Sequence, residues 1–94
     1  MRIVAVCGVG VGSSAILKTN AERALDRLGL TAGVSASDLA GVATAAADAQ
    51  VILTSTELAD QVRRAVGRSY AEIIEVSNYF DVGEIGEKLE ASLG

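Results

Sequence analysis

The sequence predicts an α/β fold, a small doubly wound parallel sheet of four strands with helices on both faces. Short apolar runs of strand length alternate with longer segments of helical period, in the order β-α-β-α-β-α-β-α. The apolar runs are nearly continuous, which is typical of strands buried on both faces. Half of the 94 residues are apolar and only three are aromatic, so we expect one aliphatic core in a single domain over residues 1–94.

The first strand and the first helix have the clearest pattern. Residues 3–6 form a continuous apolar run, and helical period begins at Ser13, after a glycine-rich loop over residues 8–12. Gly29 follows the last periodic residue, as expected for a helix end. The second strand is predicted over residues 31–37, where small and polar residues alternate.

The middle of the chain repeats the same alternation. Asp38 is expected to cap a short helix over residues 39–47, and residues 50–55 read as a buried central strand. Thr56 is expected to cap the third helix, which covers about residues 57–66 and ends at Gly67.

The last strand and helix complete the sheet. Residues 72–77 form the fourth strand, and Asp81 is expected to cap a final amphipathic helix. Right-handed crossovers leave few topologies for four parallel strands, and a flavodoxin-like (Rossmann-like) order of 2-1-3-4 is our first choice. Ligands bind such sheets at the carboxyl ends of the strands, near the switch in strand order. Cys7 ends the first strand, so it is predicted to lie at that position.

Composition excludes several classes of function. The formal net charge of −4 argues against a nucleic-acid partner and against binding to an anionic membrane surface. No apolar run approaches the roughly 18–20 residues of a membrane-spanning helix, and the apolar N-terminal run is too short for a signal peptide, so we expect a cytoplasmic protein without membrane insertion. With one cysteine and no histidine, neither an internal disulfide, a zinc site nor a Cys–His pair is expected.

The glycine-rich segment predicts an anion site with a reactive thiol beside it. Such a loop points several backbone N–H groups and the positive end of a helix in one direction, which suits a phosphoryl group. The same field lowers the pKa of a thiol at the start of the loop, so Cys7 is the candidate nucleophile. The candidate phosphate-binding residues follow it directly: Gly8, Val9, Gly10, Val11, Gly12, Ser13 and Ser14.

Three other phosphate-binding motifs fail on spacing. A Walker A loop needs a lysine directly after its last glycine, but Ser13 follows Gly12 and the nearest lysine is Lys18. The glycines follow a G-x-G-x-G pattern, whereas a dinucleotide-binding fingerprint needs G-x-G-x-x-G. A low-molecular-weight tyrosine phosphatase places an arginine after five intervening residues, where this chain has Ser13, and the chain has no proline for an Asp-Pro loop.

The stretch VCGVGVGSS resembles the phosphorylation loop of enzyme IIB components of the bacterial phosphoenolpyruvate-dependent sugar phosphotransferase system. The ascorbate type, within the lactose, galactitol and ascorbate grouping, is the most similar, and VILTST in the central strand adds to the likeness. The resemblance implies that Cys7 accepts a phosphoryl group from a phosphohistidine of enzyme IIA and passes it to a sugar bound by the membrane enzyme IIC. It implies no cofactor. Val9 and Val11 depart from related loops, which often carry polar side chains there.

Structural interpretations remain open beside the functional ones. Cys7 could be a small buried hydrophobe, and the glycines could serve only a tight turn. Ser13 and Ser14 could be helix caps, as could Ser55 and Thr56. Tyr79 and Phe80 are open in the same way, as a hydrophobic staple or as part of a docking surface. Arg63, Arg64 and Arg68 are interpreted as a solvated face, because the C-terminus of a helix favours cations.

Two functions from other classes remain alternatives to the phosphoryl carrier. One is a cysteine-phosphatase-like hydrolase that lacks the usual arginine. The other is a non-catalytic regulatory or interaction domain of the same fold.

Overall fold

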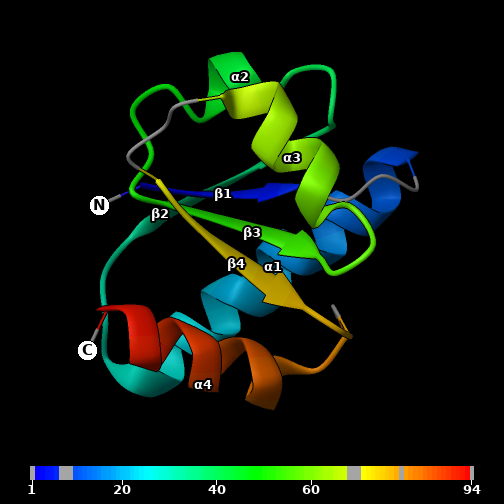
Figure 1. Cartoon of the computed structure of the whole chain (residues 1–94). Coiled ribbons are helices and arrows are strands. Elements are labelled where there is room, and N and C mark those ends of the chain that lie inside the picture. Colours follow the sequence, from blue (N-terminus) through cyan, green and yellow to red (C-terminus); the bar gives the residue numbers. More distant parts are fainter. Residues whose placement is uncertain (1, 7–9, 68–70, 79, 94) are drawn as a thin grey trace.

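The computed structural model describes residues 2–6, 10–67, 71–78 and 80–93, and it has the predicted α/β architecture (Figure 1). The four strands pair in parallel in the order β2-β1-β3-β4, which confirms the predicted topology. The strands are β1 (Arg2–Val6), β2 (Gly33–Ser37), β3 (Val51–Ser55) and β4 (Glu72–Val76). The helices are α1 (Gly10–Leu28), α2 (Val42–Ala45), α3 (Ala59–Val66) and α4 (Val82–Leu93).

Alternation of side chains along the central strands divides the core into two layers. One face of the sheet packs against α1 and α4, and the other packs against α2 and α3 (Figure 1). The first layer contains Ile3, Ala5, Leu17, Ala21, Ala24, Leu25, Val51, Leu53, Ile74, Val76, Ile85 and Leu89. The second contains Val4, Val6, Val42, Ala46, Ala49, Ile52 and Val62. Both layers are aliphatic, as the composition predicts.

The start of α1 differs from the prediction. The helix begins at Gly10, whereas the apolar period predicted a start at Ser13. Glycine is unfavourable inside a helix, so residues 10–12 read as loop in the sequence. Their N–H groups belong to the first turn, where no intrahelical acceptor exists, and the helix that begins with this turn is nineteen residues long, which stabilises it.

Two predicted caps are also wrong. The helix expected over residues 39–47 is reduced to α2, four residues long, because the Asp38 carboxylate closes a turn by accepting the Gly41 N–H at 2.7 Å. Thr56 does not cap α3. Leu58 is the residue at the N-cap, with no side-chain hydrogen bond, and the Thr56 N–H donates to the carbonyl oxygen of Val76.

The predicted helix ends at Gly29 and Gly67 and the Asp81 cap are confirmed. Gly29 has φ of +69° and Gly67 has φ of +60°, a conformation that favours glycine after a helix. Asp81 precedes α4 and its Oδ1 accepts the N–H of Glu84 at 3.1 Å, as an N-cap does.

Gly86, in the middle of α4, lies opposite Ala24 of α1 and has room for a methyl group. A Cβ atom added at Gly86 would lie 3.6 Å from the Cβ of Ala24, which is ordinary van der Waals contact. One added at Gly83, in the first turn, would lie 3.2 Å from the Asp81 Oδ1 that caps the helix.

We therefore expect Gly86→Ala to raise the free energy of unfolding by about 0.5–1 kcal/mol, because alanine favours the helix and its methyl group fits. Gly83→Ala is the matched control, and we expect its gain to be smaller or absent because its methyl group crowds the cap. Urea denaturation followed by circular dichroism measures both. A larger gain for Gly83→Ala than for Gly86→Ala would contradict this account of the α1–α4 contact.

Candidate functional site

The predicted site lies at the carboxyl edge of the sheet. All four strands are parallel, so their carboxyl ends and the segments that follow them share one edge (Figure 1). There, β1 ends at Val6 and α1 begins at Gly10. Three of the predicted site residues, Cys7, Gly8 and Val9, lie between these elements and outside the described residues. The structure thus describes the strand that leads into the site and the helix that leaves it.

The backbone of the remaining predicted site residues forms the start of α1. Gly10, Val11 and Gly12 lie in the first helical turn, where N–H groups have no acceptor within the helix. The aligned peptide dipoles of a nineteen-residue helix also give this end a partial positive charge, which favours an anion. Ser13 and Ser14 lie inside the helix, so their interpretation as N-caps does not fit the observed start.

Thr54 is a polar residue at this edge that the sequence analysis did not single out. It pairs in register with Val6, the last described residue before Cys7. Its side chain is fully buried, and its hydroxyl is the one buried side-chain polar atom without a hydrogen-bond partner among the described residues. A buried hydroxyl without a partner costs stability and is uncommon in folded proteins. A threonine directly after the aliphatic run Val51–Leu53 was the available signal.

The loop between β4 and α4 is held by the carboxylate of Glu84. Its Oε2 accepts the N–H of Ser77 at 2.9 Å and the hydroxyl of Ser77 at 2.7 Å, and its Oε1 accepts the N–H of Asn78 at 3.1 Å. Lys88 pairs with the same carboxylate at 3.1 Å. These contacts, led by the hydrogen bond from the Ser77 backbone, lower the pKa of Glu84 from 4.5 to about 2. The loop is therefore closed onto the first turn of α4 by a charged acceptor.

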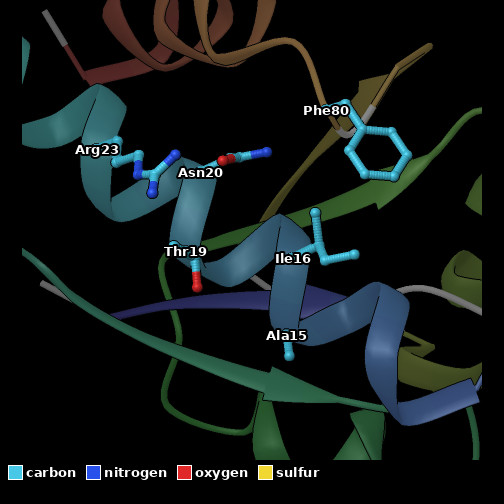
Figure 2. Close-up of a pocket in the computed structure, with 6 residues that line it drawn as sticks. All are labelled: Ala15, Ile16, Thr19, Asn20, Arg23 and Phe80. Carbon is cyan, nitrogen blue, oxygen red and sulfur yellow. The ribbon is translucent and has the colours of Figure 1, made fainter.

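Phe80 does not form the hydrophobic staple that was one interpretation of this loop. Its N–H donates to Asn78 Oδ1 at 3.0 Å, while its side chain remains 62% exposed. Phe80 instead lines a hollow of about 440 Å³ beside α1, together with Ala15, Ile16, Thr19, Asn20 and Arg23 (Figure 2). Tyr79, the other residue of that prediction, lies outside the described residues.

The two arginines of α3, Arg63 and Arg64, fit the interpretation as a solvated face only in part. Arg63 forms ion pairs with Asp60 at 3.1 Å and with Glu75 on β4 at 3.0 Å. Arg64 is exposed, and Arg68 lies outside the described residues. Arg63 therefore serves the contact between α3 and the sheet.

The described ranges contain no group of three or more histidine, cysteine, aspartate or glutamate side chains that could hold a metal ion. None of the described helices is long and apolar enough to cross a membrane.

Comparison with known proteins identifies the class to which this fold belongs. Residues 2–91 match the family described as "PTS system, Lactose/Cellobiose specific IIB subunit". The chain belongs to this family and is a phosphoryl-carrier IIB domain, a component of a sugar phosphotransferase. The resemblance to enzyme IIB drawn from the glycine-rich segment is confirmed.

The chain is similar to several individual IIB proteins over nearly its whole length. An "Ascorbate-specific PTS system EIIB component" of Mycoplasma pneumoniae is 30% identical over 93 residues, which cover 99% of this chain and 95% of the relative. A protein of the same name from Escherichia coli O157:H7 is 29% identical over 95% of this chain and 85% of its own length. The lactose-specific IIB domain of Streptococcus pneumoniae has the same fold, with a TM-score of 0.69 at 11% identity over 99% of this chain and 94% of that domain.

The Glu84 carboxylate leads to a pH-dependent prediction. Its folded-state pKa of about 2 lies below the ordinary value of 4.5, so the unfolded chain binds a proton more readily. The stabilisation is complete above about pH 4.5 and is lost as the pH falls towards 2. We expect Glu84→Gln to lower the free energy of unfolding by about 1–2 kcal/mol at pH 7 and to reduce its pH dependence between 4.5 and 2. Denaturant unfolding at several pH values measures both effects.

Glu87, exposed on the same helix, provides the control. Glu87→Gln removes the same charge from α4 without touching the Ser77–Asn78 loop, so its stability profile should follow the wild type. Equal pH profiles for Glu84→Gln and the wild type would contradict the proposed role of the Glu84 carboxylate.

Proposed function

We propose that this IIB domain carries its phosphoryl group on Cys7 and works in an ascorbate-type phosphotransferase system. Enzyme IIA would supply the group from a phosphohistidine, and the sugar bound by the membrane enzyme IIC would receive it at the cytoplasmic side. The observation that carries the proposal is that α1 begins three residues after the only cysteine, with a first turn of Gly10, Val11 and Gly12. That turn offers N–H groups and a positive helix end to an anion.

The proposed transfer needs two displacements at phosphorus. In the first, the Cys7 thiolate attacks in line, the S–P bond forms, the N–P bond to the donor histidine breaks, and the imidazole leaves with the bonding electron pair. In the second, a sugar hydroxyl oxygen attacks, the O–P bond forms, the S–P bond breaks, and the thiolate returns while the hydroxyl proton is released. The chain has no histidine, so the phosphohistidine must come from another protein.

The residues after Cys7 would bind the phosphoryl oxygens. Their amides run from Gly8 to Ser14, and the hydroxyls of Ser13 and Ser14 could add donors. The field at the start of α1 stabilises a thiolate and also the charge on the equatorial oxygens, so one structural feature serves both reactants. This chemistry requires no metal ion or organic cofactor in the chain.

The proposed sugar class rests on the relatives named ascorbate-specific, which align over nearly the whole chain at about 30% identity. The family description, by contrast, names lactose and cellobiose. We favour the ascorbate class because these relatives match in both length and sequence, whereas the lactose-specific structure shares only 11% identity.

Cys7→Ser tests the proposed nucleophile. Incubated with phosphoenolpyruvate and the upstream phosphotransferase proteins, the wild-type chain should gain the mass of one phosphate, and the label should be lost in Cys7→Ser. Intact-protein mass spectrometry measures the label, and circular dichroism checks that the variant folds. A phosphorylated Cys7→Ser chain would overturn the assignment, and rapid release of inorganic phosphate from an aryl phosphate would favour the hydrolase instead.

Gly10→Val tests the backbone cradle. A valine side chain in the first turn of α1 should crowd the bound phosphoryl group, so we expect a folded protein whose labelling is slower by about tenfold or more. Ala65→Val, at an exposed position of α3, is the control for adding a β-branched residue to a helix surface. Normal labelling of Gly10→Val would count against a cradle of backbone amides.

A further inference from the structure

Two exposed large hydrophobic side chains line the hollow beside α1. Ile16, 37% exposed, and Phe80, 62% exposed, are the two exposed large hydrophobic residues among those described. They come from α1 and from the β4–α4 loop, yet both line the same hollow of about 440 Å³. Figure 2 shows Ile16 reaching from α1 towards the side on which the Phe80 ring lies. We call this feature the Ile16–Phe80 groove.

The groove adjoins the proposed phosphoryl site. Ile16 is six residues after Gly10 on α1, a distance of about 9 Å along the helix axis. The segment between β4 and α4, which includes Phe80, follows the carboxyl end of β4 at the same edge of the sheet (Figure 1). A protein that brings a phosphohistidine to the residues before α1 therefore has this groove within its contact area.

The Phe80 wall is held in place by its own loop. The Phe80 N–H donates to Asn78 Oδ1, and the Asn78 N–H donates to Glu84 Oε1. At the other end of the same loop, Asp81 Oδ1 accepts the Glu84 N–H at 3.1 Å. These bonds fix the backbone that bears the exposed ring, so less ordering is needed when a partner binds.

The charge of the groove indicates what kind of partner it accepts. Among the described residues that line it, Arg23 is the only charged one, and it forms no ion pair with any other described residue. A partner carboxylate would complement this cation. The cytoplasmic loops of membrane proteins carry an excess of lysine and arginine, which would repel it. The charge thus favours the donor over the transporter as the occupant.

We propose that the Ile16–Phe80 groove is the docking surface for the phosphohistidine-bearing donor, which places an apolar side chain between Ile16 and Phe80 and a carboxylate against Arg23. This inference rests on the proposed phosphoryl transfer to the chain. Apolar contact beside the site also excludes water, which would otherwise compete with the thiolate for the phosphoryl group.

The test measures phosphoryl transfer from phosphorylated ascorbate-type enzyme IIA as a function of its concentration. Phe80→Ala and Arg23→Glu should each raise the KM for the donor by about tenfold while leaving the maximal rate unchanged, because they remove binding and not chemistry. The Arg23 contribution should weaken with added salt, and this salt dependence should be reduced in Arg23→Glu. Arg23→Lys should retain most of the wild-type affinity.

Matched controls separate docking from general effects. Arg64→Glu, on α3, makes the same change in net charge at a residue outside the groove and should leave the donor KM unchanged. Alkylation of Cys7 by iodoacetamide reports the thiol without any partner, and its rate should be the same in Phe80→Ala as in the wild type. A slower alkylation would place the effect of Phe80 in the site itself and overturn the docking role.

Three outcomes would reject the proposal. An unchanged donor KM in both Phe80→Ala and Arg23→Glu would show that the donor docks elsewhere. A loss confined to transfer onto transporter-bound sugar, with normal uptake from enzyme IIA, would assign the groove to the transporter. Failure of the wild-type chain to be labelled at all would refute the proposed function itself. The two failures are distinguishable, because the wild-type chain is still labelled normally when only the docking proposal is wrong.

Discussion

The structure depends on the burial of β1 from both sides. Its residues Ile3 to Val6 have no solvent exposure, since α1 and α4 cover one face of the strand and α2 and α3 cover the other. A strand buried in this way must pair on both edges, and β1 pairs in parallel with β2 and with β3. Parallel pairing then brings every strand end to one edge, so the chemistry of the domain is confined to the segments that follow the strands.

Two of those segments are organised by opposite charges. The segment after β1 leads into the positive end of α1, which favours an anion. The segment after β4 is fastened by the Glu84 carboxylate, which accepts three hydrogen bonds from Ser77 and Asn78. Because the oxygens of Glu84 accept from Ser77 and Asn78, this carboxylate does not compete with a phosphoryl group for the N–H donors of α1. The edge thus combines a helix start that favours an anion with a neighbouring segment, held by hydrogen bonds at Ser77 and Asn78, that bears Phe80.

The sequence predicted the features that depend on hydrophobic period and missed those that depend on local hydrogen bonding. The strand order, the helices on both faces of the sheet and the helix ends at Gly29 and Gly67 follow from apolar spacing and from glycine conformation. The cap at Asp81 was also correct. The predicted cap at Thr56 was wrong. A polar side chain at this position does not reveal that the backbone N–H of Thr56 will donate to the carbonyl oxygen of Val76 on β4. The exposure of Phe80 depends on how the loop closes, which no local pattern encodes.

The start of α1 shows why the glycine-rich segment was the hardest part to interpret. Glycine lowers helix propensity, yet the first turn loses no intrahelical bond at its N–H groups, so Gly10 and Gly12 are tolerated there. A glycine has no side chain to cover its own amide, which suits the close approach of a tetrahedral anion. A carrier needs this access but must not hydrolyse what it holds. Ser13, where a phosphatase has arginine, is consistent with that need, and we infer that exclusion of water during transfer comes from the docked partner and not from the domain alone.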